Sequence, residues 1–458
     1  MPHHDLVIIG AGTGNALIDD RFARLDVAIV SEGPFGGTCL NAGCIPSKML
    51  AATADTADAV ADAGRHDVDA RLGGIRWRDV NKRVFDRLDA VAAEGEEGRR
   101  AAESVTVYRG RARFTGERRL SVQTETGPVE ISADRVVVAA GGRPAVPPVV
   151  ADSGLPYETS DTVMRIARPP ERLAVLGGGY IAAELAHVFH AAGSQITVIE
   201  QGERLLAQQD QDVSDAYADA VRPHYDLRLG RELVGVAGAP GDLRLTLDDG
   251  AVLTADALLV AVGRRPNSDR LDLEKAGIAY GDDGLITVDA QLRTSAEGVW
   301  ALGDVSTGVP LKHVANREAE IVAHNLLHPG EPREMSYEAV PSAVFTSPQI
   351  AQVGLTEQEA READVAYAVA VHRYQDVAYG WALEDTSGFC KVLADRSTGR
   401  LLGAHLFGPQ AATLVQPLVL AMAMGLTVHD VAHRPMWIHP ALTEVVENAL
   451  LSLEQALR

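Results

Sequence analysis

Two passages far apart in the chain share one pattern: an apolar strand, a glycine-rich turn and the start of a helix. They occupy residues 6–15 and 173–182. Each unit then ends its second strand on an acidic residue, Glu32 in the first and Glu200 in the second. A glycine turn directly after a buried strand is typical of the nucleotide-binding half of a parallel α/β sheet. Two copies therefore predict two such units in one chain.

The glycine positions have a physical reason. Gly10 and Gly177 allow the tight turn, while Gly12 and Gly179 let a pyrophosphate approach the backbone at a helix N-terminus. The acidic residues accept hydrogen bonds from ribose hydroxyls. A single such loop is weak evidence because glycine turns also have purely structural uses, but two loops with both acids predict two dinucleotide sites. Asn15 stands where a third small residue is usual, so the first helix is expected slightly further from its strand.

Composition limits the class of protein and of partner. With 458 residues, 46% of them apolar and 23% charged, the chain is expected to form a globular protein with several domains. The formal charge of -21 argues against broad attraction to nucleic acid or to an anionic membrane. No apolar run reaches the roughly 18–20 residues that span a bilayer, and no export signal is evident. We expect a cytoplasmic protein that acts on a small molecule.

Turn-forming segments at residues 143–148 and 265–267 divide the chain. The predicted units are residues 1–150, residues 151–272, a segment 273–335 that returns to complete the first unit, and an α+β unit at 336–458. Strands in the last unit are predicted at residues 343–346, 388–394 and 401–407. The alanine- and acid-rich stretch 51–63 is predicted to be a solvated helix.

The chain has only three cysteines, which excludes a secreted disulfide scaffold. Cys39 and Cys44 are separated by four residues, a gap that the start of a helix can close into a disulfide. A helix N-terminus also lowers a thiol pKa. The alternative is a pair of buried apolar cysteines, but the flanking glycines and the adjacent fingerprint favour redox catalysis. Cys390 is most simply a core residue, and no Cys/His cluster predicts a metal site.

Four segments now identify a family resemblance: residues 36–48 (GGTCLNAGCIPSK), 138–144, 301–304 and 439–444. They resemble the pyridine nucleotide-disulfide oxidoreductases, the family of glutathione reductase, lipoamide dehydrogenase and mercuric reductase. The resemblance runs from end to end. It implies two Rossmann-like domains, for FAD and for NAD(P), and a C-terminal α+β dimerisation domain in a homodimer. The first unit would bind FAD and the second NAD(P).

The resemblance also implies which residues contact the cofactors. They are Gly10, Gly12, Glu32, Gly37, Thr38, Lys48, Gly142, Gly177, Gly179, Tyr180, Ile181, Glu184, Glu200, Gly263, Arg264, Asp304 and Ala315. Lys48 would lie near the flavin N5, where a cation stabilises charge on the reduced ring, and Glu184 would hold it in place. Tyr180 would cover the flavin until the nicotinamide displaces it, although it could instead be an ordinary helix tyrosine.

The implied reaction has two halves. Hydride passes from the nicotinamide through FAD to the Cys39–Cys44 disulfide, leaving Cys44 as the thiolate that faces the flavin. Cys39 then attacks the substrate disulfide, and Cys44 resolves the mixed disulfide. His439, oriented by Glu444, protonates the departing thiolate. In the resembling enzymes this histidine reaches the thiols of the other subunit.

Within the family, stretches in every domain resemble the mycothione reductase branch, which implies mycothiol disulfide as substrate. Residues 376–388 are the most informative of them, because their polar and aromatic character suits an amino sugar–inositol substrate; an ordinary interface loop is the alternative. Dihydrolipoamide dehydrogenase shares the active-site motifs and stays open. A non-catalytic flavin-binding redox sensor would need neither Cys39 nor His439. Mercuric reductase and high-molecular-weight thioredoxin reductase are disfavoured because no C-terminal cysteine pair is present.

The preferred reductant is predicted from the end of the second unit's acidic strand. NADPH-using members carry arginines at the places that align with Gln201 and Ala207, and this chain has neither. Glu200 instead resembles the ribose-binding glutamate of NAD-using members, so NADH is expected over NADPH. Arg204 is the one residue that could still bind a 2′-phosphate.

Overall fold

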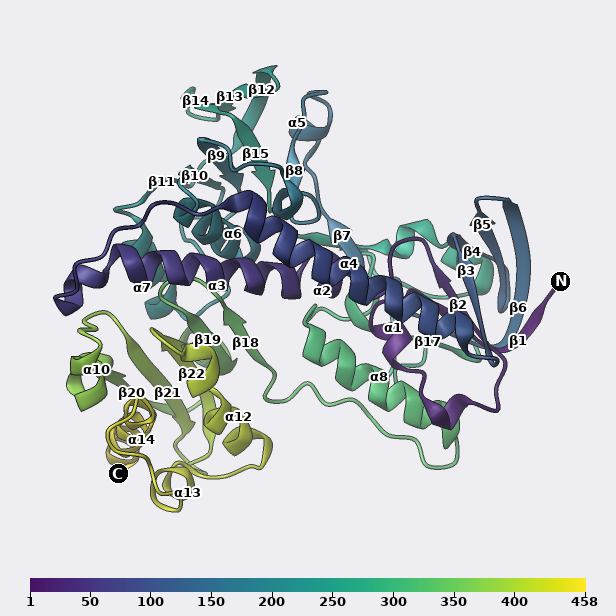
Figure 1. Ribbon diagram of the computed structural model, residues 1–458. Helices are drawn as coiled ribbons and strands as arrows, with labels where there is room; N and C mark the ends of the chain where they lie inside the picture. The colour runs from purple at the N-terminus through teal and green to yellow at the C-terminus, as the bar shows by residue number, and fades with distance from the viewer.

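The first glycine-rich passage lies in a sheet whose strands come from two separate parts of the chain (Figure 1). In the computed structural model, which describes residues 1–458, this sheet contains β1 (His3–Ile9), β2 (Val27–Ser31), β3 (Val105–Arg109), β4 (Arg111–Gly116), β5 (Arg119–Thr124), β6 (Gly127–Val138) and β17 (Val299–Ala301). Strands β3, β2, β1, β6 and β17 run parallel, and β5 and β4 extend the sheet in antiparallel fashion. The late strand β17 therefore completes an early sheet.

The second passage lies in a parallel sheet of order β11-β10-β9-β15-β8. The strands are β8 (Glu158–Thr159), β9 (Arg172–Leu176), β10 (Gln195–Glu200), β11 (Tyr225–Leu229) and β15 (Ala257–Val260), with helices α6 (Tyr180–Ala191) and α7 (Gln211–Val221). An antiparallel sheet of β12 (Leu233–Ala239), β13 (Asp242–Leu247) and β14 (Val252–Ala255) is attached to it. The turn segments predicted from the sequence meet as a two-stranded pair, β7 (Gly142–Pro144) with β16 (Arg264–Pro266).

The C-terminal part folds around an antiparallel sheet of order β18-β19-β22-β21-β20. Its strands are β18 (Pro341–Val344), β19 (Ile350–Gly354), β20 (Tyr367–Arg373), β21 (Phe389–Asp395) and β22 (Leu401–Phe407), and its helices include α9 (Glu357–Glu362), α10 (Ala378–Ala382), α12 (Gln416–Ala423), α13 (Val428–His433) and α14 (Thr443–Leu457). The predicted fold class, two dinucleotide-binding α/β units and an α+β unit, is confirmed. The exact domain boundaries stay a prediction.

One strand ends earlier than the sequence predicted. Residues 343–346 were expected to be extended, but β18 ends at Val344. The reason is that the backbone N–H of Phe345 donates to Glu184 Oε1 at 3.0 Å instead of joining the sheet. This contact connects the C-terminal sheet to helix α6.

The stretch predicted as a solvated helix belongs to a longer, half-buried one. Helix α3 runs from Cys44 to Ala61 and lies beside α4 (Trp77–Ala101) across the molecule (Figure 1). Ala51, Ala54 and Ala57 are buried, so the prediction of a solvated helix was wrong for this face. The error arises because alanine is compatible with both a surface and a close helix contact.

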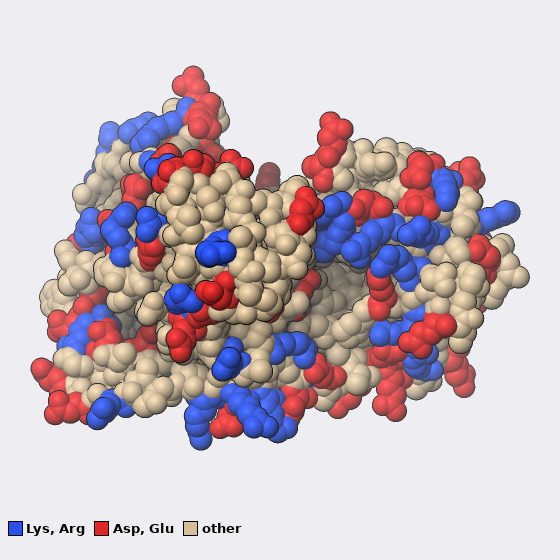
Figure 2. Space-filling model, turned by 90° about the horizontal axis from the view of Figure 1, so that it is seen from above, with Lys and Arg blue, Asp and Glu red and all other residues tan.

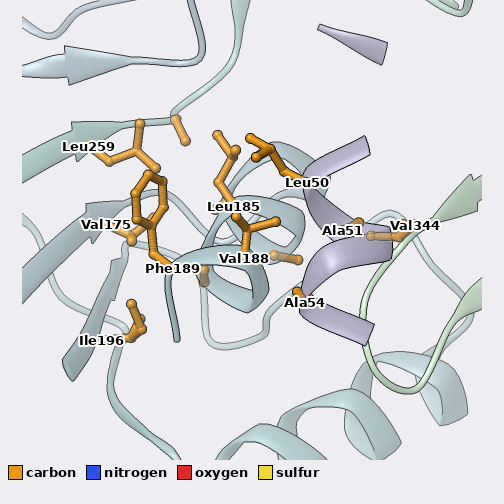
Figure 3. Packing of buried hydrophobic residues seen from close by; sticks show 14 of the residues in the cluster. Leu50, Ala51, Ala54, Val175, Leu185, Val188, Phe189, Ile196, Leu259 and Val344 are labelled. Atoms are coloured by element: carbon orange, nitrogen blue, oxygen red, sulfur yellow. The ribbon is translucent and has the colours of Figure 1, made fainter. Parts of the chain in front are cut away.

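A single hydrophobic cluster joins the three parts of the molecule. Figure 3 shows Leu50, Ala51 and Ala54 of α3 against Leu185 and Val188 of α6. The same cluster contains residues of β9, β10, β15 and β18, labelled there as Val175, Ile196, Leu259 and Val344. Because buried side chains pack closely, α3 is fixed in position and rotation on α6. The packing of α3 on α6 therefore determines the position of the side chains in the first turn of α3.

The two glycine turns have the same backbone conformation. Gly10 has φ +113° and Gly177 has φ +114°, values that side chains disfavour. A Cβ on Gly14 would lie 2.9 Å from Ile8 Cγ2, so the helix approaches the strand closely at the residue before Asn15; the wider spacing at Asn15 stays a prediction. The helix expected after the first turn is only one turn long, α1 (Thr13–Ala16). None of the helices is both long and apolar enough to cross a bilayer.

A buried ion cluster fastens the second unit to the C-terminal sheet. Lys391 of β21 is 2% exposed, and its Nζ lies 2.8 Å from Asp210 Oδ1 and 2.7 Å from both Asp212 Oδ2 and Glu357 Oε2. Burial alone would raise the pKa of Asp210, but the hydrogen bonds from Lys391 and from the Glu357 backbone outweigh it and leave that pKa below its usual value. The cluster is thus ionised: one buried cation faces three carboxylates, of which Asp212 is exposed and Glu357 also pairs with Arg361.

Replacing Lys391 by Met should therefore destabilise the protein strongly. The variant leaves the fully buried Asp210 carboxylate without its cation, a loss that typically costs about 3–5 kcal/mol. The unfolding midpoint in urea should fall accordingly. Lys82→Met, which removes an exposed pair with Asp86, is the matched control and should change stability by less than about 1 kcal/mol. Equal effects of the two substitutions would contradict this account.

Candidate active site

A continuous cavity of about 2040 Å³ runs between the three parts of the molecule. Figure 2 shows the surface hollowed between the lobe that carries the first sheet and the lobe that carries the second. Every cofactor-contacting residue predicted from the sequence lines this cavity: Gly10, Gly12, Glu32, Gly37, Thr38, Lys48, Gly142, Gly177, Gly179, Tyr180, Ile181, Glu184, Glu200, Gly263, Arg264, Asp304 and Ala315. The fold thus gathers them at one place from all along the chain.

The two cysteines lie in this cavity at the start of α3. Cys39 is in the short helix α2 (Gly37–Asn41), and Cys44 is the first residue of α3; both are free thiols. A hydrogen bond from Cys39, and then the charge of Lys48, lower the pKa of Cys44 to about 7 against the opposing effect of burial. The same hydrogen bond and burial raise the pKa of Cys39. The pair is therefore polarised, with Cys44 the readier thiolate and Cys39 the proton donor to it.

Lys48 stands one turn further along α3 and is held by Glu184. Its Nζ lies 2.7 Å from Oε1 and 2.6 Å from Oε2 of Glu184, whose side chain is only 7% exposed. Ser47 adds a hydroxyl 3.4 Å from the same carboxylate. The ring of Phe345 lies 4.8 Å from the ammonium group. These contacts fix a positive charge in the cavity within electrostatic reach of Cys44.

Another part of the cavity wall combines loops of both nucleotide-binding units. Arg264 donates to the Gly142 carbonyl at 2.5 Å and lies 3.6 Å from Asp304 Oδ2, so it connects β16 to the residues that follow β17. Tyr180, the first residue of α6, is 43% exposed and lines the same space. The Tyr180 ring therefore borders the space between the two nucleotide-binding units.

Glu32, directly after β2, and Glu200, the last residue of β10, have different hydrogen-bond partners. Glu32 pairs with Arg111, and that hydrogen bond lowers its pKa. Both oxygens of Glu200 accept backbone N–H groups, from Gly178 at 2.5 Å and from Gly202 at 2.7 Å. Arg204 also lines the cavity, and its Nε lies 3.7 Å from Asp215 Oδ1. Glu200 therefore places a fixed carboxylate beside the second glycine loop.

The first glycine loop fits a dinucleotide. A Cβ on Gly37 would lie 2.7 Å from Gly12 Cα, so two stretches of bare backbone face each other at the cavity wall. Lys312, the first residue of α8 (Lys312–Leu327), adds a cation 2.8 Å from the Thr13 hydroxyl. Exposed backbone and one ammonium group suit the pyrophosphate of FAD.

Sequence reasoning missed three contributors to the site. Lys312, Ser47 and Phe345 carry no role in the predicted set, yet all line the cavity. Ser47 and Phe345 contact the predicted Glu184, and Lys312 contacts Thr13 of the first glycine loop. Ser47 lies inside residues 36–48, which support the family resemblance, and Lys312 begins residues 312–316, one of the stretches that resemble the mycothione reductase branch. Phe345 acts through its backbone N–H and ring, which no sequence motif encodes.

The predicted acid–base pair lies apart from the thiols. His439 Nδ1 is 2.6 Å from Glu444 Oε1, but the histidine side chain is 72% exposed and is not among the residues lining the thiol cavity. The second oxygen of Glu444 is buried without a partner. Residues 376–388, expected to meet the substrate, likewise do not line this cavity. Within one chain these groups and the thiols do not form a common site.

Comparison with known proteins gives a consistent identity. Residues 4–319 match the family described as Pyridine nucleotide-disulphide oxidoreductase, and residues 340–450 match its dimerisation domain. The chain is 48% identical to mycothione reductase of Mycobacterium tuberculosis, covering 99% of this chain and 100% of that protein. It is 35% identical to dihydrolipoyl dehydrogenase of Halobacterium salinarum, covering 97% and 95%.

Solved structures agree with this result. The HOCl-induced flavoprotein disulfide reductase RclA of Escherichia coli superposes with a TM-score of 0.86 at 27% identity, over 98% of this chain and 99% of that one. The dimerisation domain supports a homodimer and a disulfide substrate. With its thiol pair and dinucleotide cavity, the chain belongs to the pyridine nucleotide-disulphide oxidoreductase family and is an FAD-dependent NAD(P)H:disulfide oxidoreductase.

Proposed function

We propose that the substrate of this enzyme is mycothiol disulfide and that Cys39 and Cys44 are its redox-active pair. The observation that carries the proposal is the full-length identity of 48% to a mycothione reductase, against 31–35% for the first dihydrolipoyl dehydrogenases. The polarised thiol pair beside Lys48 supports reduction of a disulfide by thiol exchange. Dihydrolipoamide oxidation uses the same thiols and is the competing function.

The reductive half requires a cation and an accessible thiol pair. The first glycine loop and Lys312 would hold FAD, which would supply the two electrons from NAD(P)H that reduce the Cys39–Cys44 disulfide to two thiols. Lys48 would place a positive charge beside the bound ring, and Glu184 holds the lysine in position. Cys44 retains the negative charge after reduction because its pKa is lowered to about 7.

The oxidative half requires a base for Cys39. Its raised pKa means that it must lose its proton to attack, and the proposed acceptor is His439 of the partner subunit. The Cys39 sulfur then bonds to one substrate sulfur, and the second leaves as a thiolate that takes the proton from the histidine. The Cys44 thiolate then attacks the Cys39 sulfur and closes the protein disulfide. The substrate sulfur that was bonded to Cys39 leaves as a thiolate and takes a proton from solvent. Glu444 keeps His439 oriented through Nδ1.

The thiol assignment predicts a spectroscopic signature. Two-electron reduction of the yellow enzyme should give a long-wavelength absorbance band from the Cys44 thiolate against oxidised flavin. Because the band needs the thiolate, it should be lost as the pH falls through about 7, the pKa of Cys44. Absorbance during anaerobic titration measures both effects.

Variants of all three cysteines separate the roles. Cys44→Ser should abolish the band, Cys39→Ser should keep it, and Cys390→Ser should leave it unchanged, since Cys390 is buried in the C-terminal core. A band that is lost in Cys39→Ser and kept in Cys44→Ser would show that the roles are reversed, and a band that survives in both variants would show that neither thiolate is its source.

The substrate proposal predicts a large difference between disulfides. kcat/KM for mycothiol disulfide should exceed that for glutathione disulfide and for lipoamide by at least about 100-fold, which corresponds to about 2.7 kcal/mol of transition-state binding. Steady-state assays with a common reductant compare them. A preference for lipoamide would instead assign the enzyme to the dihydrolipoyl dehydrogenases.

We also propose NADH as the preferred reductant. Glu200 is held beside the second glycine loop by two backbone N–H groups, so its carboxylate cannot easily turn away from a bound ribose. At about 4 Å, a carboxylate and one phosphate charge repel by up to roughly 4 kcal/mol at an effective dielectric of 20. The 2′-phosphate of NADPH would meet this repulsion, whereas the 2′-hydroxyl of NADH would donate a hydrogen bond.

The value of kcat/KM for NADH should therefore exceed that for NADPH by more than about tenfold. Glu200→Gln, which keeps the side-chain size but removes the charge, should raise kcat/KM for NADPH and narrow the preference. Arg204→Ser should have little effect with either reductant. An NADPH preference that disappears in Arg204→Ser would refute the proposal and show that this arginine binds the phosphate.

A further inference from the structure

Three metal-ligating side chains meet on the C-terminal helices, outside the cavity. His429 and His433 lie one turn apart on α13, with ring centroids 4.7 Å apart. Glu454 of α14 faces both: Oε1 lies 2.8 Å from His429 Nδ1, and Oε2 lies 3.0 Å from His433 Nε2. One ligand atom from each residue lies within 4.8 Å of the other two. The reaction described above uses none of them.

The two helices that carry these side chains are firmly held. A capping box between Thr427 and Asp430 fixes the start of α13. Val431 of α13 and Leu450 and Leu453 of α14 are buried in the same hydrophobic cluster. The three ligands are therefore presented by packed helices, which reduces the ordering that a bound ion would need.

We propose that His429, His433 and Glu454 form a binding site for one divalent ion of the zinc class. Two imidazoles and one carboxylate suit Zn²⁺ and similar borderline cations, whereas Mg²⁺ and Ca²⁺ require mostly oxygen ligands. With bonds of about 2.0–2.1 Å, a tetrahedral ion separates its ligand atoms by about 3.3 Å. The observed separations, up to 4.8 Å, must shorten to this value, and the exposed side chains of His429 and His433 have room to rotate. Water completes the coordination.

Proton positions are compatible with binding. In the metal-free site each ring donates an N–H to Glu454, and metal binding moves that proton to the other ring nitrogen of each solvent-exposed histidine. Arg458 lies 3.9 Å from Glu454 Oε2, but its side chain is exposed and can rotate away.

A second histidine pair in the chain provides a matched comparison. His324 and His328 have the same spacing, with ring centroids 4.8 Å apart. His324 Nε2, however, contacts the backbone carbonyl of Glu331 instead of a carboxylate. This pair offers two imidazoles without the third ligand, so the carboxylate distinguishes the two clusters.

Calorimetric titration of the oxidised, FAD-loaded homodimer with ZnCl₂ tests the site. In the oxidised enzyme the thiols are closed in a disulfide and cannot chelate the ion. The wild type should bind one Zn²⁺ per subunit, and Zn²⁺ should raise its melting temperature. Removing a residue that hydrogen-bonds to a metal ligand typically weakens metal binding by about 10- to 100-fold. His429→Ala and Glu454→Gln remove a ligand itself, so each should weaken Zn²⁺ binding by more than about 100-fold.

The controls make the result decisive. His328→Ala should retain the Zn²⁺ stoichiometry and affinity of the wild type, and MgCl₂ should give no heat of binding at this site. Glu454→Gln preserves the shape of the side chain, and an unchanged flavin spectrum verifies that it is folded. Absence of Zn²⁺ binding to the wild type, or equal binding to wild type, His429→Ala and Glu454→Gln, would overturn the proposal.

Discussion

The carboxylate of Glu184 is the contact on which the arrangement of the site depends. It binds Lys48 of α3 through both oxygens and accepts the backbone N–H of Phe345 just after β18. One side chain of the second nucleotide-binding unit thus holds the first unit and the C-terminal sheet. Because the carboxylate is almost buried, removing it would leave a half-buried ammonium group and a backbone N–H without their partner, a larger loss than that of a surface ion pair.

Helix α3 transmits this constraint to the chemistry. Its first residue is Cys44, its fifth is Lys48, and its alanine-rich face packs on α6. Small side chains on that face allow the two helices to approach closely, which brings Lys48 to Glu184. The same rigid helix therefore determines the distance between the cation and the thiol, and so contributes to the lowered pKa of Cys44. The reactivity of Cys44 thus depends on how α3 packs on α6.

The sequence predicted the fold class and the residues that line the cavity, because both depend on local signals. The glycine turns and the cysteine pair each lie within a few residues, and each acid lies at the end of the strand that follows its glycine loop, about 20 residues later. The contacts that sequence reasoning missed are long-range: Lys391 with Asp210 and Glu357, and Phe345 with Glu184. Lysine in a buried strand or a backbone N–H beside a strand end has no sequence signature. The end of β18 was mispredicted for the same reason.

The separation of His439 from the thiols bears on what a single subunit can do. One chain brings the dinucleotide cavity, the thiol pair and Lys48 together. It does not bring His439 to Cys39, whose raised pKa favours the protonated thiol. Glu444 already orients His439 in the isolated chain, so this base is prepared before it meets a partner. In the proposed mechanism, dimerisation therefore joins two preformed half-sites rather than shaping either one, and the exposed His439 is the group each subunit offers to the other.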